Sequence, residues 1–217
     1  MDLRSRLASI ARGDGAWTPP DPIPAATIVL ARDGEVLMMR RAETMRFAPR
    51  MHVFPGGRVE DIDLVATDPF CACAVREAQE EVGITVTGDV RFIDHWVTPE
   101  FETRRFDVRF FLADVVDEGA LTTTEADALL WLTPDAALAA HAQGAMAMLR
   151  PTVEVLLLMR ALLAGDAAPD VVVPKLPRPR DVDGALLWDV VDATTGAVLA
   201  QDISGPDYAE VEGVAVR

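Results

Sequence analysis

Short runs of apolar β-forming residues, some of them bounded by turn residues, recur along the chain, a pattern typical of strands. Residues 26–31 (ATIVLA) and 35–40 (EVLMMR) are apolar β-formers on either side of an Asp33-Gly34 turn, which predicts a β-hairpin. By the same criteria, further strands are expected at residues 84–87, 90–97, 105–113 and 131–132. We therefore expect a sheet to form the centre of the fold.

Three segments have helical patterning instead. The strongest is residues 69–82, because Asp68 can cap a helix, Pro69 is tolerated in its first turn, and Gly83 is a natural stop. Two more helices are expected at about residues 135–143, opened by Thr133-Pro134, and at 151–164, which has core-facing apolar spacing. Strands and helices mixed in this way indicate an α/β fold.

Proline-rich stretches divide the chain. Residues 1–24 are expected to form a short amphipathic helix followed by a lead-in with several prolines, before a main domain over residues 25–165. Residues 166–183, which begin with DAAPDVVVPKLPRPR, are expected to be a linker, and 184–217 a β-hairpin extension with its turn at 194–196. We assign no role to this extension.

Composition and charge exclude several classes of function. With 20 basic and 35 acidic residues, the net charge is −15, and the longest basic run is Arg104-Arg105, which argues against binding long nucleic acids. No segment is apolar enough to span a membrane. Cys71 and Cys73 would point in different directions on a helix, so neither a disulfide nor a metal pair is expected, and we expect a cytoplasmic protein.

Three acidic residues share one side of the predicted helix over residues 69–82. Glu77, Glu80 and Glu81 stand at positions i, i+3 and i+4, and the last two lie near the C-terminus, where the helix dipole is already negative. Such a cluster is either a solvated acidic face or a site for a divalent cation. Two upstream glycines, in FPGG at residues 54–57, indicate a close backbone approach and favour the cation site.

The chain resembles the Nudix hydrolase superfamily in this region. FPGG followed by REAQEEVGI is similar to the Nudix box, which begins here at Gly57 and closes at Ile84. The first acidic position of the box falls on Asp63, and twelve residues separate it from Arg76 where the box has seven, so about five extra residues are expected to bulge from the loop. The resemblance implies an α/β/α sandwich with a mixed sheet.

The resemblance also implies a set of roles. Glu77, Glu80 and Glu81 would bind Mg²⁺ or Mn²⁺, the carbonyl of Gly57 could add a ligand, and Arg76 would orient the carboxylates by ion pairing. The reaction implied is attack by water on one phosphorus of a diphosphate in a nucleotide derivative.

Two residues are candidates for the general base. Glu77 is the first choice. Glu125 is the second, because many Nudix sequences place an acidic loop residue just ahead of the strand that carries Trp131. An ordinary exposed loop carboxylate is the alternative interpretation of Glu125.

A second motif indicates the substrate. Arg41, Arg46 and Arg50, spaced ahead of FPGG, resemble the motif of the coenzyme A diphosphatase branch, except that Arg50 stands where the motif has glycine. These arginines and Arg105 are therefore candidates to bind the phosphates of coenzyme A or an acyl-coenzyme A, while pairing with nearby acids is the alternative for some of them.

Two other functions stay open at this point. The same box serves enzymes that hydrolyse ADP-ribose, NADH or another nucleoside diphosphate derivative. A catalytically silent Nudix fold that binds a nucleotide or a partner is the alternative outside the enzymes, and the intact Arg-Glu-x-x-Glu-Glu run counts against it. The expected partner is a small nucleotide diphosphate; many relatives form homodimers, although the sequence itself shows no interface.

Overall fold

The computed structural model describes residues 1–44, 49–182 and 185–203. The chain forms two compact units. The larger consists of residues 25–94 and 109–170, and the smaller of residues 1–24, 95–108 and those described from 171 on. Each unit is described below by itself.

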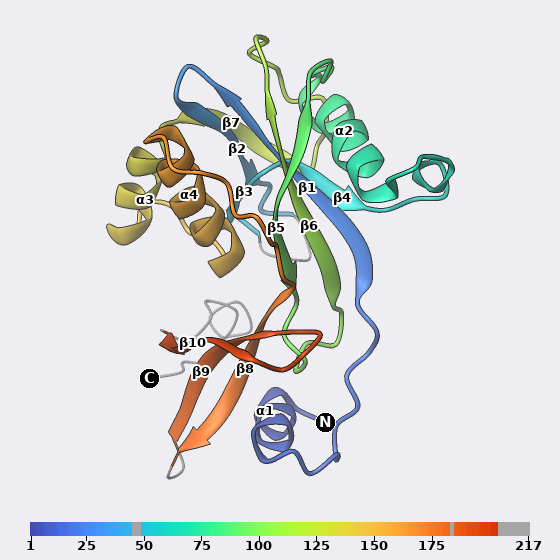
Figure 1. The fold of residues 1–217 in the computed structure, drawn as a ribbon, viewed down its shortest axis with the longest axis vertical. Coiled ribbons are helices and arrows are strands. Elements are labelled where there is room, and N and C mark those ends of the chain that lie inside the picture. Colours follow the sequence, from blue (N-terminus) through green and yellow to red (C-terminus); the bar gives the residue numbers. More distant parts are fainter. Residues whose placement is uncertain (45–48, 183–184, 204–217) are drawn as a thin grey trace. The chain divides into compact units, whose positions relative to one another are not determined.

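The elements are shown in Figure 1. In chain order they are α1 (Leu3–Arg12), β1 (Ile23–Arg32), β2 (Glu35–Arg41), β3 (His52–Val53), β4 (Gly56–Arg58), the 3-10 helix η1 (Asp63–Val65), α2 (Pro69–Val82), β5 (Val90–Val97), β6 (Phe106–Asp114), β7 (Ala126–Leu132), α3 (Pro134–Ala142), α4 (Arg150–Leu163), β8 (Lys175–Val182), β9 (Ala185–Asp192) and β10 (Val198–Ile203). Strands β5 and β6 contribute residues to both units.

The predicted first hairpin is confirmed. Strands β1 and β2 pair antiparallel, with Arg32 opposite Glu35. Asp33 and Gly34 between them have φ angles of 52° and 82°, which is the double left-handed turn that matches the twist of a two-residue hairpin. This hairpin provides the central strands of the larger unit.

The larger unit is an α/β sandwich. Its strands lie in the order β5-β6-β1-β2-β3, with β4 also pairing with β1 and β7 with β2. Alternate residues of β1, from Ala26 through Ile28 to Leu30, share a core with Ala74 and Ala78 of α2. Figure 1 shows α2 on one side of these strands and α3 and α4 on the other. The predicted α/β/α arrangement is thus confirmed.

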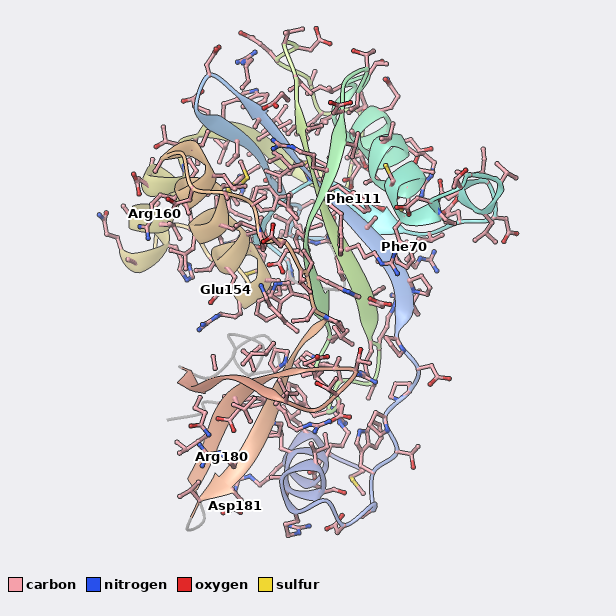
Figure 2. All side chains as sticks on the ribbon, viewed as in Figure 1. Phe70, Phe111, Glu154, Arg160, Arg180 and Asp181 are labelled. Carbon is pink, nitrogen blue, oxygen red and sulfur yellow. The ribbon has the colours of Figure 1, made fainter. Side chains whose placement is uncertain are left out.

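The labelled side chains of the larger unit lie on both faces of its sheet (Figure 2). Phe70 of α2 packs against the core on one face, where Phe111 of β6 is buried. Glu154 and Arg160 stand on α4, on the opposite side of the sheet. The predicted later helices are confirmed, and Thr133 caps α3 by accepting a hydrogen bond from the N–H of Ala136 at 3.2 Å.

The smaller unit combines both ends of the chain. Helix α1 contacts β8, and the antiparallel strands β8, β9 and β10 follow one another. Phe101 meets Trp188 edge to face, with ring centroids 5.6 Å apart, and Glu100 receives two hydrogen bonds from Arg178. The predicted C-terminal hairpin is present as β9 and β10; residues from 204 on lie outside the described part.

Strand β8 lies within the stretch expected to be a linker. Successive backbone N–H groups of a strand point to opposite edges, so Pro177 and Pro179, two residues apart, remove donors from one edge only. Strand β8 pairs with β9 over its whole length, whereas its described pairing with β5 is at Lys175, opposite Trp96. The prolines are therefore compatible with a strand at this place.

The prediction of a strand at residues 84–87 is wrong. Gly83 ends α2 in the left-handed region, and the N–H of Ile84 donates to the carbonyl of Ala78. Ile84 then inserts its side chain into the core without strand pairing, so its apolar character reflects packing. Within the described residues, every helix is too short or too polar to cross a bilayer.

Candidate active site

Helix α2 forms over the residues predicted for it. The carboxylate of Asp68 accepts hydrogen bonds from the N–H groups of Phe70 and Cys71 at 3.0 and 3.1 Å, which satisfies donors that the first turn leaves unpaired. Gly83 closes the helix at φ 68°. The apolar side of α2 faces the sheet. Glu77, Glu80 and Glu81 lie together on another side of the helix, because positions i, i+3 and i+4 share one face.

Two consecutive glycines bring the backbone of β4 against this acidic side. A Cβ on Gly57 would lie 2.0 Å from Oε1 of Glu77, closer than any real contact. A Cβ on Gly56 would lie 2.5 Å from the carbonyl oxygen of Ala26 on the paired strand β1. Gly56 therefore requires glycine, because the clash would be with backbone, whereas a side chain at Gly57 would have to displace the flexible carboxylate of Glu77.

Arg76 ties the site together. Its Nε and Nη2 donate to the two carboxylate oxygens of Asp63 at 3.1 and 3.0 Å, and its Nη1 donates to Glu77 and Glu80, both at 2.8 Å. Asp63 is only 3% exposed, and its second oxygen also accepts the N–H of Glu60 at 2.9 Å. Hydrogen bonds to Asp63 first, and then to the two glutamates, raise the pKa of Arg76, which stays charged.

Asp63 is the acidic anchor of the loop before α2. Burial would raise the pKa of Asp63, but its hydrogen bonds with Arg76 and with the Glu60 N–H outweigh that effect, and the pKa lies below its usual value. Asp63 is thus an ionised, structural partner of Arg76. The loop with extra residues closes on this pair through η1.

Glu81 is the most deeply buried carboxylate of the cluster. It is 8% exposed, and its Oε2 accepts the N–H of Gly56 at 2.8 Å. Burial raises the pKa of Glu81 to about 7; the Gly56 N–H opposes that change, and the charges of Glu77 and Glu125 add to it. Burial likewise raises the pKa of Glu77, although the hydrogen bond from Arg76 acts in the opposite direction. Glu77 and Glu81 are therefore two buried carboxylates whose charged forms burial disfavours.

Arg41 and Glu125 lie near enough to this acidic side for their charges to act on Glu81. Glu125 precedes β7, its carbonyl accepts the N–H of Ala42 at 2.8 Å, and Arg41 pairs with Ala126 in the sheet. The charges of Arg41 and Glu125 both act on the pKa of Glu81, after its burial and Glu77, in opposite directions. The structure thus brings two residues that lie far from α2 in sequence to the same site.

Arg50 occupies a strained position. Its N–H donates to the carbonyl of Arg41 at 3.0 Å, while the Arg41 N–H donates to the carbonyl of Met51 at 2.9 Å, so two residues oppose one. Arg50 has φ 61°, the left-handed conformation that glycine usually supplies in this kind of β-bulge. This explains why the resembling motif has glycine here. The Arg50 side chain is exposed and pairs with Glu43 at 2.7 Å.

The other two candidate arginines are placed differently. Arg46 lies outside the described residues. Arg105 belongs to the smaller unit, where it is buried and donates hydrogen bonds to the carbonyls of Thr98 and Pro20, both at 3.0 Å. Burial lowers the pKa of Arg105. Its described hydrogen bonds serve the packing of the smaller unit.

The carboxylates do not yet converge on a single point. Among the residues that the structure describes, no three His, Cys, Asp or Glu side chains are gathered closely enough to hold a metal ion as they stand. Glu77 and Glu80 face Arg76, and Glu81 faces the Gly56 N–H. The oxygen donors suit a hard divalent cation in their chemistry, and the buried charge of Glu77 and Glu81 is what such an ion would offset.

Sequence reasoning missed several parts of this site. Strands β3 and β4 are too short to show a periodic pattern. The thiol of Cys73 donates to the carbonyl of Arg58 at 3.3 Å, and burial raises its pKa to about 12, so it is an inert packing group. Its neighbour Cys71 is also a free thiol. The signal that could have indicated β4 is the glycine pair itself.

Comparison with known proteins agrees with this geometry. A family model described as NUDIX domain matches residues 21–160. Over 150 residues, the chain is 31% identical to the Caenorhabditis elegans protein named "Putative nudix hydrolase 7". That match covers 51% of either protein, so the chain spans about half the length of this curated relative.

Solved structures give a similar result. The crystal structure of a NUDIX hydrolase from Alicyclobacillus acidocaldarius aligns with a TM-score of 0.59 and 28% identity, covering 69% of this chain and 98% of that one. A MutT NUDIX hydrolase from Burkholderia pseudomallei aligns with a TM-score of 0.52 and 18% identity, covering 63% and 97%, which is a likeness of fold alone.

Proposed function

The chain belongs to the NUDIX domain family, and from that premise we propose that it is a metal-dependent hydrolase that cleaves a diphosphate linkage in a nucleotide derivative. The observation that carries this proposal is the pair of buried carboxylates Glu77 and Glu81, which lie against Gly57 and Gly56 and whose charged forms burial disfavours. Buried carboxylates are costly unless a cation accompanies them. A diphosphate needs the same cation.

The proposed ligands of Mg²⁺ or Mn²⁺ are Glu77, Glu80 and Glu81, with the carbonyl of Gly57 as a further donor. When bound, a divalent ion would neutralise charge on the phosphoryl oxygens and lower the pKa of the attacking water. Glu80 is the most exposed member of the set, since its side chain is 58% exposed, and its described ion pair is with Arg76. Turning Glu80 away from Arg76 is the adjustment that completes the site.

The chain's own residues would supply the remaining steps. Arg76 keeps Glu77 in place while Asp63 keeps Arg76 in place, so the helix presents its carboxylates in a fixed orientation. A carboxylate then accepts the proton of the attacking water. Glu77 and Glu125 are the two candidates, the first on α2 and the second just before β7.

Coenzyme A or an acyl-coenzyme A is the substrate that we propose. Both carry a diphosphate between an adenosine and a pantetheine half, and their several phosphates need cationic partners. Arg41, beside Glu81, and Arg50, paired to Arg41 through the bulge, are the described arginines of the larger unit that support this choice. Arg46 is proposed from the motif alone and Arg105 from the sequence alone; the described hydrogen bonds of Arg105 go to the carbonyls of Thr98 and Pro20.

A panel of substrates tests the proposal. The purified protein is incubated with coenzyme A, an acyl-coenzyme A, ADP-ribose and NADH, each with Mg²⁺, Mn²⁺ or a chelator, and products are separated by chromatography. We expect a phosphopantetheine and an adenosine bisphosphate from the first two. Release of AMP from ADP-ribose or NADH alone would replace the coenzyme A assignment and keep the reaction class.

Two variants separate an enzyme from a silent binding module. Glu80→Gln removes a proposed ligand at an exposed position, so it should lower turnover at least a hundredfold while leaving the thermal midpoint nearly unchanged. Glu154→Gln is the matched control on α4, across the sheet from α2 (Figure 2), and should keep full activity. Absence of metal-stimulated turnover in the wild type with every substrate would refute the enzyme.

A further inference from the structure

The loop between β6 and β7 is fixed to the end of α2 that carries the carboxylates. The N–H of Ala120 donates to the carbonyl of Val82 at 2.9 Å, and the N–H of Thr122 donates to the carbonyl of Glu81 at 3.0 Å. The Thr122 hydroxyl also donates to the carbonyl of Glu80. A helix leaves its last carbonyls without partners within the helix, and here the loop supplies them.

A glycine and a tryptophan hold the same loop from its other side. Gly119 has φ 70°, and a Cβ there would lie 2.9 Å from both the Val82 carbonyl oxygen and a side-chain carbon of Ile84. The indole N–H of Trp131 donates to the carbonyl of Glu118 at 2.9 Å, and Trp131 lies under the guanidinium of Arg32 at 4.5 Å. The loop is therefore anchored on both sides, which is unusual for a surface connection.

This anchored loop ends at Glu125, one of the two candidate bases. Only two residues separate Thr122 from Glu125, so the position of one limits the position of the other to about 10 Å. The Glu125 N–H donates to the hydroxyl of Thr123 at 3.1 Å, and its carbonyl accepts the N–H of Ala42. Both ends of the segment from Thr122 to Glu125 are thus hydrogen-bonded, one to α2 and one to the chain beyond β2.

We propose that Thr122 is a positioning residue, which holds Glu125 in register with the carboxylates of α2. The inference rests on the proposed function, and it assigns to Glu125 the role of accepting the proton of the attacking water. A substitution of Thr122 can remove the hydroxyl alone, because the backbone hydrogen bonds of Ala120 and Thr122 do not depend on the side chain. Without the hydroxyl, the segment from Thr122 to Glu125 loses one of its hydrogen bonds to α2.

Two substitutions isolate the hydroxyl. Thr122→Val keeps the shape and removes the donor, whereas Thr122→Ser keeps the donor. Thr122 is exposed, so neither change should unfold the protein. We expect Thr122→Val to lower kcat about tenfold with little change in KM, within the roughly hundredfold that a displacement of about an ångström can cost. Thr122→Ser should retain wild-type kcat, and a loss as large as that of valine would overturn the proposal.

A double-mutant cycle tests whether Thr122 acts through Glu125. Thr122→Val is made in the wild type and in Glu125→Gln, and kcat is measured for all four proteins. The proposal expects the tenfold loss in the first background and almost none in the second. Equal losses in both backgrounds, or an unchanged kcat in Glu125→Gln alone, would overturn it.

Amide hydrogen exchange of the metal-free protein gives a reading that does not depend on turnover. Residues 119–125 should lose protection in Thr122→Val and keep it in Thr122→Ser, whereas equal protection in all three proteins would refute the positioning contact. Failure of the proposed function is recognised separately, since it would show as absence of metal-dependent hydrolysis in the wild type.

Discussion

Replacing Glu81 with glutamine should stabilise the metal-free protein at alkaline pH. Glu81 is 8% exposed, and its described hydrogen bond comes from the N–H of Gly56. Glutamine keeps an oxygen to accept that hydrogen bond but does not ionise. The charge that the substitution removes is the one that burial opposes most strongly in this site.

The magnitude follows from the pKa of Glu81. Burial raises it from 4.5 to about 7 in the folded chain. A raised carboxylate pKa means that the folded state keeps a proton that the unfolded state has lost, so the free energy of unfolding falls as pH rises from 4.5 to 7. At about 1.4 kcal/mol per pKa unit, this difference amounts to about 3 kcal/mol above pH 7. Glu81→Gln is free of that loss.

Urea unfolding in a chelator, followed by tryptophan fluorescence and circular dichroism at pH 5, 6.5 and 8.5, measures the effect. The difference between Glu81→Gln and the wild type should shift in favour of the variant by up to about 3 kcal/mol across this range. Glu80→Gln is the control and should show less than about 1 kcal/mol of change, since Glu80 is mostly exposed. A difference that is the same at all three pH values would refute the reasoning. Saturating Mg²⁺ should then stabilise the wild type and leave Glu81→Gln nearly unchanged.

Substitutions at three further positions test other contacts. Gly57→Ala should lower turnover, because the new Cβ would lie 2.0 Å from the carboxylate of Glu77 and displace it, while the thermal midpoint should change little because that side chain is flexible; wild-type turnover would contradict this expectation. Arg50→Gly should raise the free energy of unfolding by about 1 kcal/mol by relieving the left-handed strain, and should raise KM for coenzyme A, while Arg50→Lys should preserve KM. Asp68→Ala should cost about 1 kcal/mol by removing the cap of α2, with kcat unchanged per folded molecule in an assay below the unfolding transition.

Local signals explain why the central elements could be predicted. Asp33-Gly34 needs two left-handed residues in a row, and Asp68-Pro69 with Gly83 sets both ends of α2. In each case the residues that determine the structure are adjacent in sequence. The shared acidic side of α2 followed from helix geometry for the same reason.

Long-range contacts explain what could not be predicted. Residues 84–87 have the composition of a strand, but no described strand pairs with them, and Ile84 is buried in the core instead. Residues 175–182 include two prolines and were expected to belong to a linker, but they form strand β8 because they pair with β9. The proximity of Arg41 and Glu125 to Glu81 depends on sheet pairing that no local pattern records.

The extra residues before α2 show how a site can survive a change in its spacing. Asp63 lies thirteen positions before Arg76, yet the two are joined by two hydrogen bonds of 3.0 and 3.1 Å. Arg76 also donates a hydrogen bond to Glu77, so Asp63 fixes the arginine that orients a carboxylate of the site. This contact does not depend on how many residues lie between Asp63 and Arg76. The additional chain is taken up at the surface, where Ile62 and Val65 are exposed while Asp63 between them is buried. What the site requires is therefore the closing pair, and the number of residues in the loop is a consequence of how that pair is reached.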